Sequence, residues 1–178
     1  MKRITPQQFK DAFLQAVSNE QSRLLELWYA KGEYTQFVKS TVLRDIGQHI
    51  GLNTYSHEYW YLDCIYYESF DLEHFSAKSS FAHYIAVALE HENDLTSTYV
   101  EMNRLSTFNT PLKVLITYAQ TPAERALYLE HYTKILRAAD IFGDFATQKR
   151  QLVIFGSENG TTASWHFYVY EASGFQEL

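Results

Sequence analysis

The sequence predicts a single α/β domain, with a mixed central sheet flanked by helices. Helical and strand patterns alternate along the chain, as in folds that pack helices on a sheet. A length of 178 residues with 46% hydrophobic content suffices for one buried core. Neither a linker nor an internal repeat divides the sequence. We therefore expect one domain over 1–178, with a core at 5–118 and an added C-terminal helix and β-hairpin at 121–172.

The first element has a clear helix start. Thr5-Pro6-Gln7-Gln8 combines a capping Thr, a Pro at the first helical position and a Gln at the third. Apolar residues then recur at helical spacing as far as Ala30. The pattern predicts one helix over 5–30, with Glu20 inside its buried stripe.

Three further segments precede the middle of the chain. Lys31-Gly32-Glu33 predicts a turn, and the apolar spacing from Phe37 to Ile50 predicts a second helix. Gly51 suits the left-handed residue that ends many helices. From His57 to Glu68 the residues are mostly aromatic or β-branched, which favours a strand.

The central segments continue the alternation. Ala82 to Glu92 alternates between two faces and predicts a strand, in which Ala86 and Ala88 share a face with Glu90 and Glu92. A helix follows, with Asn93 or Asp94 as its cap and an apolar stripe from Leu95 to Leu105. Leu112 to Tyr118 is almost continuously apolar, which is typical of a buried strand.

The C-terminal third predicts a helix and a hairpin. Thr121-Pro122-Ala123-Glu124 is a full capping box that opens a helix to about Ala139, and Gly143 closes the segment. Two strands, 151–155 and 164–171, flank Ser157-Glu158-Asn159-Gly160. Asn-Gly in that position is a strong hairpin signal.

Composition limits the function classes. A net charge of −6 and a pI near 5.6 argue against a broad basic surface for nucleic acid, so a nucleic-acid partner would need local basic patches. The single cysteine, Cys64, excludes an internal disulfide and predicts a core thiol. The first residues form no apolar leader and no run of about 18 apolar residues occurs, so we expect a cytoplasmic protein with no membrane contact.

Three acidic residues form the candidate site. Residues two apart in a strand share a face, so Glu90 and Glu92 are expected to project together. Asp63 lies in the middle of the preceding predicted strand and stands beside Glu90 if the two strands pair. Carboxylates in contact repel and raise one another's pKa unless a cation or a proton joins them. Mg²⁺ or Mn²⁺ suits oxygen ligands and can promote hydrolysis of a phosphodiester.

The arrangement resembles the PD-(D/E)XK restriction-endonuclease-like superfamily, whose core runs helix, strands, helix, strand, with an Asp on one strand and Glu-x-Lys on the next. Asp63 matches the Asp and Glu90 the first acid, while Glu92 stands where most members have Lys. Glu20 matches the acid that the first helix often turns toward the metal. The resemblance covers about two thirds of the chain and implies a Mg²⁺-dependent nuclease or a nuclease-like protein.

The sequence departs from the superfamily pattern at three points. A strand hairpin usually precedes the Glu-x-Lys strand, whereas only one strand, 57–68, is evident here before Ala82. The Lys that orients the attacking water is missing, and no Pro precedes Asp63. A degenerate member that does not cleave is therefore an open alternative.

Ordinary structural roles also remain open for these residues. Glu90 and Glu92 can be exposed acids at the end of a strand, and Asp63 can pair with an Arg or a Lys instead of a metal. Glu20 can mark the point where its helix leaves the core. The seven histidines have no zinc-ligand spacing, and His57, His83 and His91 are expected on the surface or packed.

Other functions remain open as well. The missing Lys and the net charge of −6 allow a non-catalytic interaction or regulatory module that binds a basic protein partner. The 14 tyrosines suit cores and binding surfaces alike, so a small-molecule binding domain is a third possibility, without particular residues to support it.

Overall fold

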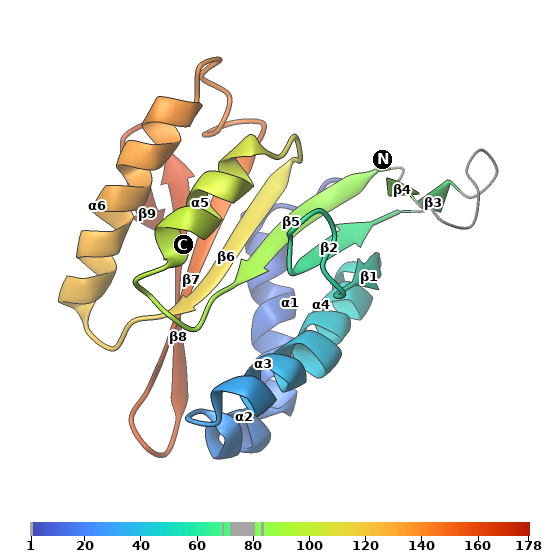
Figure 1. Cartoon of the computed structure of the whole chain (residues 1–178), viewed down its shortest axis with the longest axis vertical. Coiled ribbons are helices and arrows are strands. Elements are labelled where there is room, and N and C mark those ends of the chain that lie inside the picture. Colours follow the sequence, from blue (N-terminus) through green and yellow to red (C-terminus); the bar gives the residue numbers. More distant parts are fainter. Residues whose placement is uncertain (1, 69, 72–80, 83) are drawn as a thin grey trace.

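A seven-stranded mixed sheet forms the centre of the computed structural model, which describes residues 2–68, 70–71, 81–82 and 84–178 (Figure 1). Its strands, in spatial order, are β1 Asn53–Tyr55, β2 Cys64–Tyr67, β5 Ile85–His91, β6 Leu112–Tyr118, β7 Arg150–Glu158, β8 Ala163–Glu171 and β9 Gly174–Glu177. A separate pair consists of β3 Phe70–Asp71 and β4 Phe81–Ala82. The helical segments are α1 Pro6–Asn19, α2 Gln21–Leu27, α3 Lys31–Phe37, the π-helix η1 Val38–Val42, α4 Leu43–Ile50, α5 Thr98–Thr107 and α6 Pro122–Ala139.

The helices form a layer on each side of the sheet (Figure 1). The segments α1 to α4 pack their apolar residues against one face, and α5 and α6 pack theirs against the other. Strands β5, β6 and β7 run parallel, because α5 and α6 carry the chain back between them. All other neighbours in the sheet are antiparallel. The predicted α/β class with a mixed sheet is therefore confirmed.

The N-terminal helices differ from the prediction in two places. The expected helix over 5–30 is two helices, because α1 ends at Glu20, whose φ of −114° and ψ of 12° are not helical. Ser18 and Asn19, which are weak helix formers, precede this break. The predicted turn at 31–33 is wrong, since these residues open α3 and place Glu33 in its first turn, where an acid is favoured.

The strand predicted over 57–68 is mostly a loop. Only Cys64–Tyr67 is extended, and Asp63 lies in a bend just before β2. The loop turns tightly, with positive φ at Glu58, Trp60 and Tyr61. Strand β1 pairs antiparallel with β2 and supplies a second strand ahead of β5, which the sequence pattern did not reveal.

The next segment is also shorter than predicted. Strand β5 begins at Ile85 and ends at His91, so Glu92 lies just outside it. Residue Ala82 belongs to β4, and His83 lies outside the described residues. The cap prediction at 93–94 is wrong, because Ser97 occupies the N-cap position of α5 while Asp94 opens the preceding turn.

The second half follows the prediction closely. Strand β6 has the predicted bounds, and α6 carries both hydrogen bonds of the Thr121–Glu124 capping box. Residue Gly51 ends α4 with a left-handed φ of 64°. Strands β7 and β8 pair as the predicted hairpin, and β9 is an additional edge strand. Among the described residues, no helix is both long and apolar enough to cross a membrane.

Candidate functional site

The candidate site lies where β5 ends and β2 begins. Cys64 pairs with Leu89 in the antiparallel register, which places Asp63 beside Glu90. The parallel strands β5, β6 and β7 also have their carboxyl ends at this edge of the sheet. Ligands in open α/β sheets commonly bind at such an edge. The pairing of β2 with β5 therefore brings Asp63 and Glu90 close together, as predicted.

Hydrogen bonds tie the two acidic residues together. The backbone N–H of Asp63 donates to Oε2 of Glu90 at 3.3 Å. In return, Oδ2 of Asp63 accepts from the backbone N–H of His91 at 2.9 Å. Each carboxylate is thus held by the other strand's backbone.

Each carboxylate also has a basic partner, and the two partners come from opposite layers. The Nζ of Lys39, in the π-helical segment η1, lies 2.5 Å from Oδ1 of Asp63. From α5, Arg104 donates to Oε1 of Glu90 at 2.9 Å and also contacts Glu101 and the carbonyl oxygen of Tyr61. The alternative that Asp63 pairs with a basic side chain is therefore observed.

The two carboxyl groups differ in exposure and hence in charge. The side chain of Asp63 is 24% exposed, whereas that of Glu90 is 2% exposed. Burial, followed by repulsion from Asp63, raises the pKa of Glu90 to about 9, and Arg104 opposes this rise only in part. Burial beside Asp63 therefore favours the protonated form of Glu90 at neutral pH. A bound cation could take the place of that proton.

The other two predicted site residues have different local roles. The carboxylate of Glu92 accepts from the backbone N–H of Asp94 at 2.7 Å, so it shapes the turn after β5. The break between α1 and α2 contains Glu20, which is half-buried. Within the part of the chain that the structure describes, no three His, Cys, Asp or Glu side chains converge as metal ligands. The structure thus brings Asp63 and Glu90 together, without Glu92 or Glu20 as a third ligand.

Ala88, which the strand pattern places on one face with Glu90, lies in the protein interior. This residue is fully buried in the hydrophobic cluster under α5 and α6. Cys64 is a buried free thiol, as predicted, and burial raises its pKa. His91 is packed inside the protein, also as predicted, and burial lowers its pKa to about 4.

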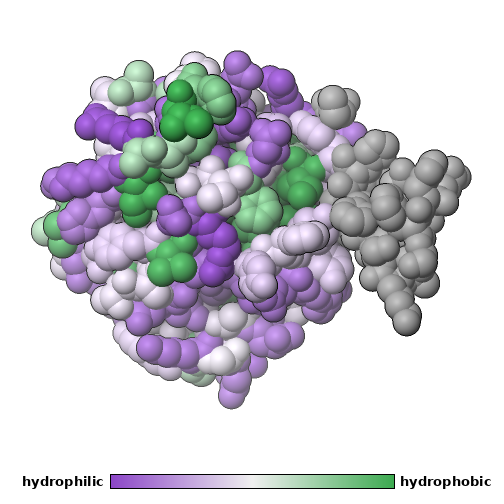
Figure 2. Space-filling model, turned by 45° about the horizontal axis from the view of Figure 1, so that its top comes forward, coloured by the Kyte–Doolittle hydropathy of each residue, from purple (hydrophilic) through white to green (hydrophobic). Residues whose placement is uncertain are grey.

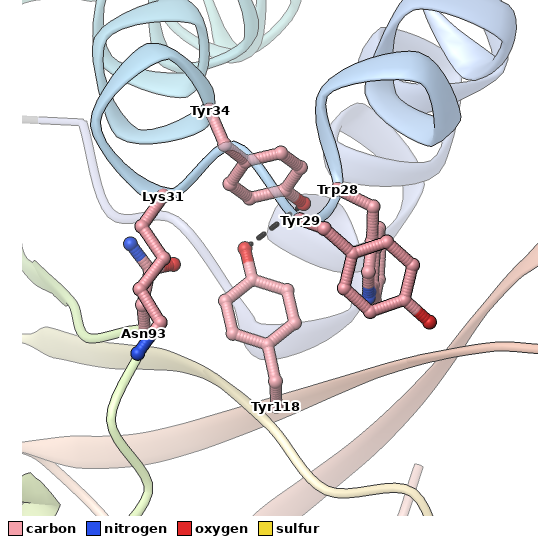
Figure 3. A pocket seen from close by; sticks show the side chains of 6 residues that line it. All are labelled: Trp28, Tyr29, Lys31, Tyr34, Asn93 and Tyr118. Carbon is pink, nitrogen blue, oxygen red and sulfur yellow. Dashed lines mark hydrogen bonds between the residues drawn. The ribbon is translucent and has the colours of Figure 1, made fainter.

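A pocket with aromatic walls adjoins the acidic pair through His91. The Nε2 of His91 lies 2.7 Å from the hydroxyl of Tyr118, which donates to the hydroxyl of Tyr34 at 3.0 Å. The cavity is about 130 Å³ in volume (Figure 3), and its lining residues are Trp28, Tyr29, Lys31, Tyr34, Asn93 and Tyr118. Both tyrosine hydroxyls therefore connect the pocket to the edge of β5.

Sequence reasoning missed Lys39, Arg104 and the pocket residues. No spacing rule places Lys39 near Asp63, because the two are 24 residues apart and Lys39 lies within the π-helical segment, where α-helical spacing does not hold. A signal did exist for Arg104, since α5 follows β5 directly and packs over it. The aromatic content was evident, but its convergence at the ends of β5 and β6 depends on the fold.

Comparison of the chain with protein-family models and with curated proteins finds no match.

Proposed function

We propose that this chain is a metal-dependent nuclease-like protein that acts on phosphodiesters, with Asp63 and Glu90 as the ligands of Mg²⁺ or Mn²⁺. The observation that carries the proposal is that Glu90 accepts from the backbone N–H of Asp63 while Asp63 accepts from that of His91, the residue after Glu90, combined with the raised pKa of Glu90. Asp63 repels the ionised form of Glu90, and a cation or a proton relieves such repulsion.

The donor set fits a hard cation. Mg²⁺ often binds through one or two carboxylates and keeps several water molecules, so a third protein ligand is not required. The partly exposed Asp63 provides access from solvent. When bound, such an ion polarises a phosphoryl oxygen and lowers the pKa of a coordinated water.

Two basic residues complete the proposed site. Lys39 places an ammonium beside Asp63, although the position that usually holds Lys is Glu92 here. Arg104 lies beside Glu90, and an arginine fork suits a phosphate group. Strand β1 also gives the hairpin ahead of β5 that the resemblance leads us to expect. These features support the proposal despite the overall negative charge.

Calorimetric titration with Mn²⁺ at pH 7.5 tests the metal site. We expect one site and, because Glu90 is protonated at this pH, the release of about one proton per ion, measured from the dependence of the heat on the buffer. Asp63→Asn and Glu90→Gln should each abolish binding. Glu26→Gln, in an exposed acid that pairs with Arg23, is the matched control and should bind normally.

The same titration separates a site of two carboxylates from a site of three. Glu92→Gln should retain the affinity of the wild type, because its carboxylate serves the turn at Asp94. Absence of Mn²⁺ binding by the wild type, or equal binding after Asp63→Asn, would contradict the proposal. Cleavage of single- and double-stranded DNA and RNA, with Glu90→Gln as the inactive variant, then tests hydrolysis itself.

A second candidate is a non-catalytic module that binds a basic protein partner. The observation that favours it is that Lys39 and Arg104 already contact the carboxyl groups of Asp63 and Glu90. On the face shown in Figure 2, apolar residues form separate patches among polar ones, and the net charge of −6 suits a basic partner. Metal titrations without heat and no nuclease activity would favour this module, and cleavage that Glu90→Gln abolishes would exclude it.

A further inference from the structure

The pocket beside the acidic pair has aromatic walls that are fixed in place. The Trp28 ring meets those of Tyr34 and Tyr118 edge-on, at centroid distances of 5.5 and 5.2 Å. Tyr29 is 79% exposed and lies at the rim of the pocket. Its hydroxyl donates to Glu158, and this hydrogen bond orients the ring. Figure 3 shows Trp28 and Tyr29 on one side of the two central tyrosines. A flat ring could therefore enter without rearranging the walls.

The hydrogen bonds that run from His91 through the hydroxyl of Tyr118 to that of Tyr34, called the hydroxyl chain, leave a hydrogen-bond donor at the pocket. The Nδ1 of His91 is buried without a partner among the described residues, whereas its Nε2 lies 2.7 Å from the hydroxyl of Tyr118. Because a buried N–H without an acceptor costs more than a bare lone pair, the ring proton belongs on Nε2 and is donated to Tyr118. Tyr118 donates in turn to Tyr34. The O–H of Tyr34 then has no acceptor among the described residues and is free for a ligand.

Two further polar groups stand on the side of the pocket opposite Trp28 (Figure 3). The amide nitrogen of Asn93 donates to the hydroxyl of Thr35 at 2.5 Å, which leaves the amide oxygen to accept from a ligand. Lys31 is exposed and attracts Asp94, but its ammonium forms no ion pair within 4.0 Å among the described residues. The pocket thus offers a cation, a neutral donor and an acceptor.

We infer that this pocket binds a nucleotide, with the base between the aromatic side chains and the phosphate at Lys31. Aromatic rings stack on any base, and an unpaired base edge contains both donors and acceptors for Asn93 and Tyr34. Lys31 favours an anionic ligand and disfavours a cationic one. The inference rests on the proposed function in one respect, because a strand bound at Asp63 and Glu90 is the natural source of such a base.

The dimensions agree with a single base. A drug-sized ligand needs a pocket of at least about 300 Å³, and 130 Å³ is well below that. Tyr34 and Lys39 belong to one continuous helical run, five residues apart, so the pocket lies roughly 8 Å along the helix from the lysine at Asp63. A base held in the pocket would leave the adjoining backbone near the acidic pair.

Nuclear magnetic resonance on the full chain tests this inference. The indole N–H resonance of Trp28, assigned with Trp28→Phe, is followed as 5′-mononucleotides of the four bases are added. We expect saturable shifts with an affinity of about 1 mM or better for at least one base, and no shift at the 64% exposed Trp60. Lys31→Gln should weaken nucleotide binding by up to about fivefold and leave nucleoside binding unchanged.

Further ligands and variants decide between the outcomes. Tyr34→Phe keeps the ring and removes the donor, so it should weaken nucleotides and nucleosides alike. The pocket inference is wrong if no nucleotide moves the Trp28 resonance, or if inorganic phosphate alone reproduces the shifts. Asp63→Asn should bind nucleotides normally. Nucleotide binding without metal binding would overturn the proposed function alone, and nuclease activity without nucleotide binding would overturn the pocket alone.

Discussion

The acidic pair, Asp63 and Glu90, and the aromatic pocket share His91. They differ in whether their polar groups already have hydrogen-bond or ion-pair partners. The backbone of His91 serves Asp63, and its ring serves Tyr118. In the acidic pair, both carboxylates already have basic and backbone partners. In the pocket, the Tyr34 donor and the Asn93 acceptor remain open. A ligand of the acidic pair must therefore replace a proton or a basic side chain, whereas the pocket can accept a ligand as it is.

The largest expected effect is an alkaline loss of stability that comes from the acidic pair. The pKa of Glu90 is about 9 in the folded protein and 4.5 in a free side chain. The folded state holds this proton more tightly than the unfolded state does. The contribution of Glu90 to the free energy of unfolding is therefore complete below pH 4.5 and falls as the pH rises to about 9, by up to about 1.4 kcal/mol per pH unit. The free energy of unfolding should drop between pH 7 and 9 in the wild type, and Glu90→Gln should remove this part of the drop.

Urea denaturation at pH 7, 8 and 9 measures this difference between the two proteins. Burial lowers the pKa of Lys113 to about 8, so the contribution of this residue to the stability of the protein increases above pH 8. This increase is the same in the wild type and in Glu90→Gln. His91 affects stability only at lower pH, because its lowered pKa destabilises the folded protein as the pH falls from 6.5 toward 4. Equal slopes for wild type and Glu90→Gln would show that Glu90 is ionised at neutral pH.

A second substitution should damage the pocket and spare the acidic pair. A Cβ at Gly156 would lie 2.7 Å from ring atoms of both Tyr118 and Trp165, and neither packed ring can move freely. We expect Gly156→Ala to lower the free energy of unfolding by about 1–3 kcal/mol and to abolish nucleotide shifts at Trp28. Gly32→Ala is the control, since nothing lies within 4 Å of its added Cβ. Loss of Mn²⁺ binding in Gly156→Ala would mean that the two regions are not separable.

The hydroxyl chain gives a smaller effect. Tyr118→Phe leaves the His91 ring without its partner, and we expect a loss of about 1–2 kcal/mol by urea denaturation. Tyr34→Phe removes only the terminal hydroxyl and should cost less. If the two variants lose equal stability, the proposed direction of the hydrogen bonds from His91 through Tyr118 to Tyr34 is wrong.

The smallest expected stability effect belongs to Lys39. Its pair with Asp63 is partly exposed, so Lys39→Met should cost less than about 1 kcal/mol. Removing a cation that competes for Asp63 should leave Mn²⁺ affinity unchanged or higher, while nuclease activity falls. A large loss of Mn²⁺ affinity in the titration would contradict the role given to Lys39.

The sequence predicted those parts of the fold that depend on local signals. The capping box at Thr121 and the apolar run of β6 both have the structure that their patterns indicate. The loop before Asp63 could not be predicted, because large aromatic residues such as Trp60 and Tyr61 rarely adopt positive φ. Strand-favouring residues there lie in a turn that the surrounding protein imposes.

The candidate site was predicted only in its central pair. Strand pairing placed Asp63 beside Glu90, as expected from two neighbouring strands. Glu90 and Glu92 do not share a strand face as predicted, because β5 ends at His91. The carboxylate of Glu92 instead accepts a hydrogen bond within the following turn. Basic partners from helices on both layers depend on tertiary packing and leave no trace in strand periodicity.

The π-helical segment has a consequence for chain length at this position. Leu43 donates its backbone N–H to Val38, five residues back, so the turn contains one residue more than an α-helical turn. Deletion of Ser40 would restore regular winding and rotate everything before it by about 100° relative to the buried side of α4. Tyr34 and Lys39 would then lose their common alignment with the sheet edge. Substitutions of the half-buried Ser40 and Thr41 should be tolerated, whereas a one-residue shortening should not.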